Sequence, residues 1–307
     1  MLMIKNISNE SDFETMCNIE STVAKHSDFS IYSSRPCNLV FDRYLFGSGA
    51  QDVFKYGKLI IKDGTAIGYV LAYLVFSYES EFVVRLLPQY SNYYTEAIES
   101  VEAMFSDKKA LSIIANDSNI HLCNALSECG FVRENEERWQ AGLDLRSYTA
   151  ADVVWQGEFI KILSENDIED RVKFAEIPTG EVITKNMYEE LMSCDYYNTA
   201  LDYVVRSAAA DEFIGFVTWW TDKNSKTATL EPVACLPNFR RKGIMKRTLF
   251  HGLNELKRQG LHYAYVSTSI DNEKAQALYL SVGFQKSGTV CRWVACNEKT
   301  WYNANGR

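Results

Sequence analysis

The sequence has few prolines and no long apolar run. Only five of its 307 residues are proline and no low-complexity stretch occurs, so we expect ordinary packed domains. No stretch approaches the roughly 20 apolar residues that a membrane-spanning helix needs. The first residues, MLMIKNISNESDF, contain neither an apolar run of signal-peptide length nor a small-residue cleavage site. We therefore expect a cytoplasmic protein without a membrane partner.

An excess of positive charge is also missing. The net charge is −8 at pH 7, and the isoelectric point is about 5.2. Because binding to a phosphate backbone needs clustered Lys and Arg, this composition argues against a nucleic-acid partner. It is compatible with a neutral or cationic small substrate, although most acidic proteins are simply soluble.

Recognisable metal and disulfide motifs are missing too. None of the eight cysteines forms a C-x-x-C pair, and none lies beside a histidine at the spacing of zinc ligands. We therefore expect no metal, and reduced thiols that are mostly packed. The cysteines are Cys17, Cys37, Cys123, Cys129, Cys194, Cys235, Cys291 and Cys296, and the histidines, which form no motif, are His26, His121, His251 and His262.

The sequence does contain an internal repeat. Three pairs of segments recur in the same order, at offsets of 147, 149 and 153 residues. They are Ile67-Gly68 with Ile214-Gly215, 87–90 with 236–239, and the stretch ending at Phe131 with the stretch ending at Phe284. Any one match alone would be chance, but three in register indicate a duplication.

Residue patterns predict the same order of elements in both halves. In the second half, β-branched and aromatic residues predict strands from about residues 201, 212, 228 and 263. A helix is expected over 242–259, whose apolar face is Met245, Leu249, Leu253 and Leu256. A second helix should begin after Asn272 and end at Gly283, before a last strand. We predict two domains, 1–148 and 149–307.

The stretch from Glu231 to Leu249 carries the chemical signal. A predicted strand runs into a basic turn with a single glycine, Gly243, and a helix begins at once. A helix N-terminus has unpaired N–H groups and partial positive charge, and glycine lets the backbone approach a ligand closely. Arg240, Arg241, Lys242 and Lys246 add formal charge. These features suit a phosphate. If the charges are considered alone, the better interpretation is a solvated basic helix start that binds no ligand.

This stretch resembles the signature of the GNAT superfamily of acyl-CoA-dependent N-acyltransferases. The family pattern is Arg or Gln, two residues, Gly, one residue, then Gly or Ala, and residues 240–245 follow it except at the last position. There Met245 either crowds the pyrophosphate or points into the helix face. Residues 271–284 are similar to the family's Asn…Ala…Leu-Tyr…Gly-Phe stretch. The resemblance covers 156–297 well, and the first half only through the repeat.

The resemblance implies an α+β fold with two tandem GNAT-like domains, each a mixed, mainly antiparallel twisted sheet flanked by helices. It implies acetyl-CoA as cosubstrate and transfer of its acyl group to an amine of a small molecule or peptide, by direct attack in a ternary complex. A monomer and a homodimer both remain open. One alternative is an acyl-CoA-binding regulatory module without turnover. A Rossmann-type nucleotide enzyme is disfavoured, because no G-x-G-x-x-G follows a strand.

The resemblance also implies roles for individual residues. The strand before the turn would pair with the pantetheine arm as an added strand does, the turn would hold the pyrophosphate, and an asparagine would help to position the arm. The cofactor-binding residues are then Val233, Ala234, Cys235, Arg240, Arg241, Lys242, Gly243, Ile244, Met245, Lys246 and Asn272.

Two residues are expected to carry the proton transfers. An ammonium group cannot attack a thioester, so Glu231 is the expected base, unless it is only a surface residue at a strand end. Tyr279 stands where the family has its general-acid tyrosine. The alternative interpretation is a structural tyrosine whose ring is packed and whose hydroxyl contacts solvent. Cys235 as a covalent nucleophile is disfavoured because no histidine lies near it in the sequence.

Aromatic residues near the predicted strands are candidates for the acceptor site, but the sequence does not decide among them. Trp219 and Trp220 should place one ring on each sheet face, where one could line the acceptor pocket, although core packing is the simpler reading. The pair Tyr196-Tyr197 could also reach an acceptor groove.

The first half lacks these site features. In the repeat, 91–94 (Ser-Asn-Tyr-Tyr) stand at the place of 240–243, and Leu126 stands at the place of Tyr279. A bulky, uncharged turn is a poor anion site. The sequence therefore predicts one acetyl-CoA site per chain, in the second half.

Overall fold

The structure is a computed structural model that describes residues 2–26, 39, 53–75, 79–104, 110–179, 184–194 and 196–295. The chain divides into two compact units. Unit 1 comprises Met1–Gln140 and Ser287–Arg307, and unit 2 comprises Ala141–Lys286. Cys37 and Cys296, two of the expected thiols, lie outside the described residues, whereas the six described cysteines are all free.

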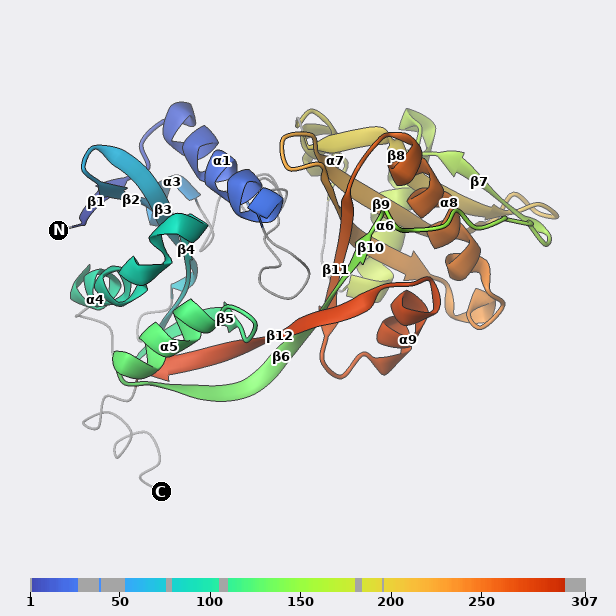
Figure 1. The fold of residues 1–307 in the computed structure, drawn as a ribbon. Helices are drawn as coiled ribbons and strands as arrows, with labels where there is room; N and C mark the ends of the chain where they lie inside the picture. The colour runs from blue at the N-terminus through green and yellow to red at the C-terminus, as the bar shows by residue number, and fades with distance from the viewer. Residues whose placement is uncertain are drawn as a thin grey trace, which may run out of the picture. The chain divides into compact units, whose positions relative to one another are not determined.

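Unit 1 is a mixed sheet covered by helices. Its strands lie in the order β1-β2-β3-β4-β5-β12-β6, and β4 and β5 are parallel whereas β1 to β4 are antiparallel in turn. Helix α1 packs on one face, and α4 and α5 cover the other (Figure 1). The elements are β1 (Met3–Asn6), α1 (Glu10–His26), α3 (Val53–Tyr56), β2 (Gly57–Lys62), β3 (Thr65–Val75), β4 (Glu79–Leu86), the 3-10 helix η1 (Pro88–Tyr93), α4 (Tyr94–Met104), β5 (Ala110–Asn116), α5 (Ile120–Glu128), β6 (Phe131–Asp144) and β12 (Gln285–Ala295).

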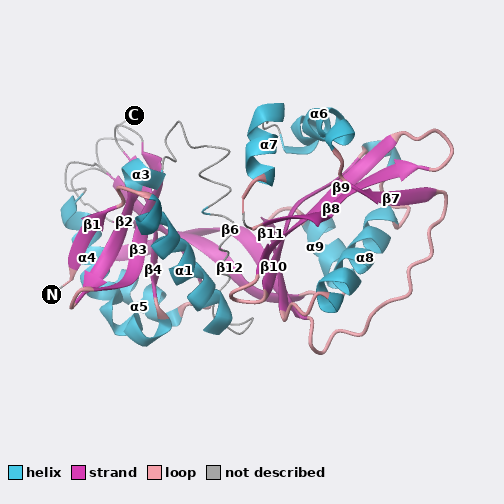
Figure 2. Ribbon diagram, turned by 90° about the horizontal axis from the view of Figure 1, so that it is seen from above, coloured by secondary structure: helices cyan, strands magenta, loops and turns pink. Residues whose placement is uncertain are grey.

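Unit 2 repeats this design. Its strands lie in the order β11-β10-β9-β8-β7, with β10 and β11 parallel and the other neighbours antiparallel. Figure 2 shows α6 and α7 on one side of this sheet and α8 and α9 on the other. The elements are β7 (Glu158–Ile162), the 3-10 helix η2 (Glu165–Asp167), α6 (Ile168–Thr179), α7 (Lys185–Met192), β8 (Tyr197–Ser207), β9 (Phe213–Asp222), β10 (Thr227–Cys235), the 3-10 helix η3 (Pro237–Phe239), α8 (Ile244–Arg258), β11 (Tyr263–Ser269) and α9 (Glu273–Ser281).

The predicted fold class is confirmed, and the repeat extends to small details. Gly68 and Gly215 occupy equivalent places, and a Cβ there would lie 2.2 Å from the Arg85 carbonyl oxygen and 2.3 Å from that of Ala234. Each glycine thus lets the next strand approach closely. Asn119 and Asn272 are equivalent too, since each caps its helix by accepting a hydrogen bond from the N–H three residues on.

The helix over 242–259 forms as predicted. Met245, Leu249, Leu253 and Leu256 are all buried in α8. At Gly252 a Cβ would lie 2.2 Å from Nε1 of Trp219, so the helix backbone lies directly on that ring. Trp219 and Trp220 are both buried, and Trp219 packs in the core under α8.

The compact units differ from the predicted domains 1–148 and 149–307 at two places. Residues 141–148 lie with unit 2, where Leu145 N donates to His262 O at 2.8 Å. Strand β12 lies with unit 1, paired antiparallel with β5 from Val290↔Asn116 to Val294↔Ser112. The last strand of the second half therefore belongs to the sheet of the first. A strand's own residue pattern does not specify its partner, so the sequence could not show this.

Helix α7 is an element that the sequence analysis does not predict. It spans only Lys185–Met192, and its N-cap Thr184 accepts a hydrogen bond from Met187 N at 3.3 Å. So short a helix depends on packing, here through Tyr188 and Leu191, more than on a periodic pattern. Among the described residues, no helix combines the length and the apolar character needed to cross a membrane.

Candidate functional site

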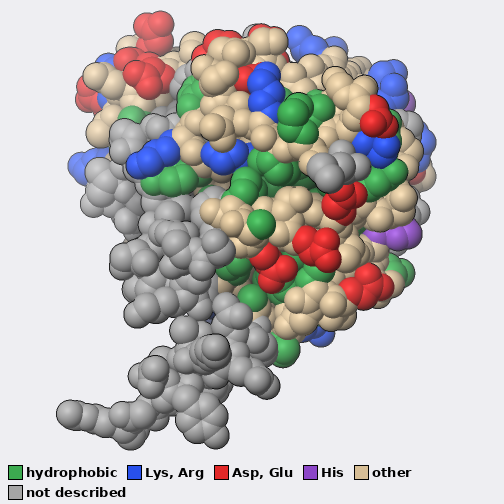
Figure 3. All heavy atoms as spheres, turned by 90° about the vertical axis from the view of Figure 1, so that its left-hand side faces the viewer, with side chains coloured by type: hydrophobic (Ala, Val, Ile, Leu, Met, Phe, Trp, Pro, Cys, Tyr) green, Lys and Arg blue, Asp and Glu red, His purple; other side chains and the backbone are tan. Residues whose placement is uncertain are grey.

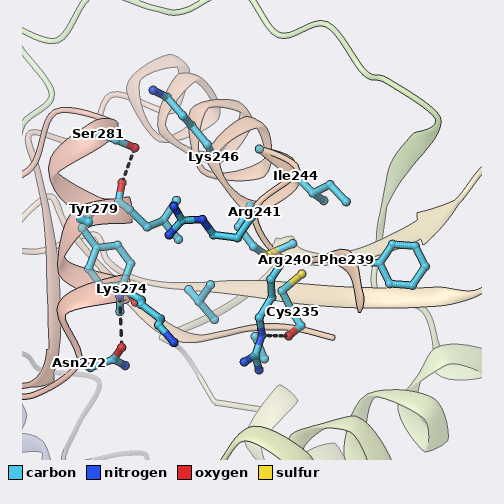
Figure 4. Close-up of a pocket in the computed structure, with 17 residues that line it drawn as sticks. Cys235, Phe239, Arg240, Arg241, Ile244, Lys246, Asn272, Lys274, Tyr279 and Ser281 are labelled. Atoms are coloured by element: carbon cyan, nitrogen blue, oxygen red, sulfur yellow. Dashed lines mark hydrogen bonds between the residues drawn. The ribbon is translucent and has the colours of Figure 1, made fainter. Parts of the chain in front are cut away.

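Unit 2 contains a cleft of about 670 Å³ between the end of β10, the start of α8 and helix α9 (Figure 4). Most of the predicted site residues line it, namely Val233, Ala234, Cys235, Arg240, Arg241, Gly243, Ile244, Met245, Lys246, Asn272 and Tyr279. Glu231 and Lys242 are not among the lining residues. The cleft also has lining residues that the sequence analysis did not select, namely Phe239, Lys274, Ala275, Ala277, Leu278 and Ser281.

The cleft opens where two parallel strands part. Strands β10 and β11 pair from Thr227↔Tyr263 to Leu230↔Val266. Beyond Leu230, β10 continues to pair with β9 on its other side as far as Cys235↔Gly215. Its edge over 233–235 therefore faces the cleft with backbone groups that a ligand can pair with, as an added strand would.

Glu231 lies at the point of separation. The register of β10 against β9 shifts between Leu230 and Val233, which marks a bulge, and the Glu231–Pro232 peptide bond is cis. The Glu231 residue is half-buried, and its carbonyl oxygen accepts a hydrogen bond of 2.6 Å from Nε1 of Trp220. Bulges commonly re-aim a side chain at the edge of a site.

The turn between η3 and α8 has the geometry of an anion site. Arg241 and Gly243 both have positive φ, at 64° and 74°, so the chain reverses within three residues. Gly243 is the N-cap of α8 and provides no side-chain cap. The first N–H groups of α8 are thus free of a side-chain acceptor, and such groups bind phosphate.

Positively charged residues from three elements line the cleft near this helix start. Arg241 extends from the turn toward α9, while Lys246 projects from α8 and Lys274 from α9 (Figure 4). Within the described part of the chain, the side chains of these three residues make no hydrogen bond or ion pair. The ammonium of Lys246 lies 5.6 Å from the centre of the Phe250 ring, and that of Lys242 lies 5.1 Å from the centre of the Phe239 ring. Lys274 was missed because the family signature does not name it, although its place in the first turn of α9 is a signal.

The side chain of Met245 is turned away from the helix start. It is 8% exposed, and its Cε would lie 3.2 Å from a Cβ on Gly215 in β9. Of the two orientations left open by the sequence, Met245 therefore adopts the one that points into the helix–sheet interface.

Arg247 connects the turn before α8 to Glu158 on β7. Its Nε donates to Oε1 of buried Glu158 at 2.5 Å, and its Nη2 donates to the carbonyl oxygen of Lys242 at 3.2 Å. A Cβ on Gly243 would lie 2.9 Å from Arg247 Nη1. The sequence analysis missed Arg247, because both partners are brought to it only by the fold.

Helix α9 supplies the other wall. The side-chain oxygen of Asn272 is used in capping, where it accepts from Ala275 N at 3.2 Å, so its amide N–H groups remain as donors toward a ligand. Tyr279 is 7% exposed and lines the same cleft, with its ring edge-on to Phe284 at 6.1 Å.

The thiol of Cys235 lines the cleft without the features of a nucleophile. Burial raises its pKa, and this outweighs the lowering by Arg240 and Lys242. The thiol donates to the Leu236 carbonyl oxygen at 3.6 Å, while Arg240 Nε donates to the Cys235 carbonyl oxygen at 2.9 Å. Across the described residues, no group of three or more His, Cys, Asp or Glu could hold a metal ion.

The equivalent place in unit 1 is filled by a tyrosine. Tyr94 stands where the repeat puts Gly243, and it is 1% exposed. Its hydroxyl oxygen accepts hydrogen bonds from Leu86 N at 3.4 Å and from Asn119 Nδ2 at 3.2 Å. Burial raises the pKa of Tyr94.

These contacts correspond to groups that face the cleft in unit 2. Leu86 is the counterpart of Cys235, and Asn119 is the counterpart of Asn272. Helix α4 also differs from α8 in charge, because it carries Glu96 in its first turn and no basic residue. Figure 3 shows both acidic and basic side chains on one face of unit 1. Unit 1 thus fills with its own side chain the place that unit 2 leaves open.

A sequence profile described as "Acetyltransferase (GNAT) family" matches residues 170–284. Residues 170–284 of this chain are therefore similar to an acetyltransferase domain of the GNAT family. No curated protein sequence matches the chain.

Solved structures share the fold over nearly the whole chain. An acetyltransferase from the GNAT family of Colwellia psychrerythraea is 13% identical, with a TM-score of 0.65 over 95% of this chain and 99% of that one. A GCN5-related N-acetyltransferase from Sphaerobacter thermophilus is 12% identical, with a TM-score of 0.63 over 95% of both chains. A tandem GNAT protein from the clavulanic acid biosynthesis pathway is 12% identical, with a TM-score of 0.64 over 96% of this chain and 98% of that one. At these identities the likeness shows the fold, which is that of tandem GNAT proteins.

Proposed function

We propose that this protein is an N-acetyltransferase that moves the acetyl group of acetyl-CoA to an amine of a small molecule or peptide. The observation that carries the proposal is the cleft of unit 2, where an open strand edge meets an uncapped, cationic helix start. A pantetheine arm and a pyrophosphate need these two features side by side.

The cofactor-binding roles follow from this cleft. The edge of Val233, Ala234 and Cys235 pairs with the amides of the arm, and Asn272 donates to it from the opposite wall. The turn of Arg240 to Lys246 holds the pyrophosphate through N–H groups of α8, with Arg241 and Lys246 neutralising its charge. Lys242 belongs to the turn and Lys274 lines the cleft, so both add long-range attraction for the pyrophosphate.

The reaction is a direct attack in a ternary complex. The lone pair of the amine nitrogen attacks the thioester carbon, and the C–S bond breaks as the tetrahedral intermediate collapses. Glu231 takes the proton from the amine, directly or through a water. Tyr279 gives its phenolic proton to the leaving thiolate, whose pKa is similar to that of a phenol. A thioester is already activated, so we assign no metal to this reaction.

An acyl-CoA-binding module without turnover is the second candidate. It would share the cleft and the helix start, and would differ only in chemistry at Glu231 and Tyr279. Unit 1, whose equivalent place is filled by Tyr94, shows that a copy in this chain has diverged from the unit 2 arrangement. We further propose a cytoplasmic protein that acts as a monomer or homodimer.

A library of amines assayed for acetyl-CoA-dependent release of free thiol tests the proposal. We expect release with at least one class of amine, above the background hydrolysis measured without an acceptor. Calorimetric titration of acetyl-CoA, run in parallel, separates the two candidates. Binding without release across a broad panel would favour the binding module, and no binding at all would refute both.

A further inference from the structure

The geometry around Glu231 assigns a role to Trp220. We propose that Trp220 is a positioning residue, whose indole N–H fixes the carbonyl of Glu231 and so directs the Glu231 carboxylate into the split between β10 and β11. The inference rests on the proposed function for the meaning of that carboxylate. The hydrogen bond itself does not depend on it.

The hydrogen bond acts at the one place where it can set the direction of the strand. Its length of 2.6 Å joins Trp220 Nε1 to the Glu231 carbonyl oxygen, inside the bulge between Leu230 and Val233. At Leu230 the pairing with β11 ends, whereas from Val233 onward β9 holds the strand again. Between these points the register of β10 against β9 shifts, and the Trp220 indole is a side-chain donor to the Glu231 carbonyl oxygen there.

The Trp220 ring is itself held by a buried polar network. Its edge contact with Tyr197 has a centroid distance of 5.5 Å and an interplanar angle of 67°. The Tyr197 hydroxyl donates to Oδ2 of Asp202 at 2.8 Å, and Asp202 is 0% exposed. The edge-to-face contact with Tyr197, whose hydroxyl is itself held by a hydrogen bond, favours one orientation of the Trp220 ring.

Asp202 accepts further hydrogen bonds from side chains on two other elements, β9 and α7. Thr218 Oγ1 on β9 donates to its Oδ1 at 2.9 Å, and the Tyr188 hydroxyl of α7 donates to its Oδ2. Burial is the largest cause that raises the pKa of both Tyr188 and Tyr197, so both remain protonated donors. The network therefore joins α7, β8 and β9, and the Trp220 indole connects it to the split.

The neighbouring tryptophan is a matched control. Trp219 is also fully buried, but it lies under α8 and its Nε1 has no hydrogen-bond partner among the described residues. Trp219→Phe and Trp220→Phe thus remove the same atoms from adjacent places in one strand. Only the second substitution removes a hydrogen bond to Glu231.

The first experiment compares kinetics of the full-length variants with an amine accepted by the wild type. For Trp220→Phe we expect kcat to fall by about 10- to 100-fold, the scale for a misplaced catalytic group, with acetyl-CoA affinity within about 2-fold. The deficit should shrink as pH rises, because amine that is already deprotonated needs no base. Trp219→Phe should keep the wild-type kcat and pH profile. Equal losses in both variants, or no loss in Trp220→Phe, would overturn the proposal.

A second measurement needs no turnover. The carbonyl carbon resonance of Glu231 should shift in Trp220→Phe and stay in place in Trp219→Phe, with thermal melts confirming that both variants fold. If the wild type binds acetyl-CoA but acetylates no amine, the proposed function fails while this shift still supports the hydrogen bond. An unchanged Glu231 resonance in Trp220→Phe refutes the positioning role whatever the activity.

Discussion

Single residues decide whether the turn before α8 can accept a pyrophosphate. Gly243 adopts a φ of 74°, and a side chain there would meet the guanidinium of Arg247. Gly243→Val should therefore weaken acetyl-CoA binding by about 10-fold or more, which corresponds to roughly 1.4 kcal/mol. Calorimetric titration of the folded variant measures this.

Gly260 provides a matched control for this substitution. It also has a positive φ, at 77°, and follows the other end of α8, where a Cβ would meet nothing within 4 Å. Gly260→Val introduces similar backbone strain away from the cleft, so the affinity of its folded form should stay at the wild-type value. An unchanged affinity in Gly243→Val would contradict the assignment of the turn.

The hydroxyl of Tyr279 is a second test at this scale. Tyr279→Phe removes one oxygen and keeps the ring against Phe284. If the hydroxyl protonates the thiolate, kcat should fall by about 10²-fold or more, with little change in acetyl-CoA affinity, because the interaction strengthens mainly in the transition state. Steady-state kinetics over a range of pH measures the loss.

Tyr148→Phe is the control for Tyr279→Phe. Its hydroxyl bonds Asn254 Oδ1 at 3.1 Å and does not line the cleft. Its loss should leave kcat unaltered. Full kcat in Tyr279→Phe at every pH would make Tyr279 structural and leave Glu231 and solvent to transfer the protons.

At the scale of elements, the start of α6 depends on one carboxylate. Burial alone would raise the pKa of Asp167, but hydrogen bonds from Lys161, Ser164 and Arg206 outweigh it and lower the pKa to about 2. In the unfolded chain the value is near 3.8. A lowered acid pKa stabilises the folded state above the unfolded value, so this contribution is lost as pH falls from about 4 to about 2.

Asp167→Asn should remove this acid-dependent contribution. We expect the free energy of unfolding of the wild type to fall more steeply between pH 4 and pH 2 than that of the variant, in denaturant titrations at each pH. Glu165→Gln, which changes a carboxylate of the same 3-10 helix, is the control and should keep the wild-type slope. Parallel slopes for wild type and Asp167→Asn would contradict the role given to Asp167.

Among the elements of unit 2, some features could be predicted from the sequence and others could not. Periodicity and caps located α8 and α9 because their signals are local: an apolar face in α8 and Asn272 in α9. The signature located the turn because its glycine and cations are consecutive. Lys274 and Arg247 were not predicted, and neither was the contact of Trp220 with Glu231, since each depends on partners that only the fold brings together.

At the scale of the whole molecule, the two copies predict a stoichiometry. Tyr94 fills in unit 1 the place that Gly243 leaves open in unit 2, and its hydroxyl occupies Leu86 N and Asn119. We therefore expect one acetyl-CoA bound per chain by calorimetry. A stoichiometry near two would show that unit 1 retains a site, and the Gly243→Val variant would then still bind one equivalent.

The placement of β12 has a consequence for how the chain can be cut. Unit 2 is sequence inserted within unit 1, because the chain leaves unit 1 after Gln140 and returns to it at Ser287. A stop codon after Lys286 would delete no residue of the cleft, and yet it would take from the other copy the strand that pairs with β5. Such a truncation would expose the edge of β5 in unit 1. No single cut of the chain separates the two units, because unit 1 is made of residues on both sides of unit 2.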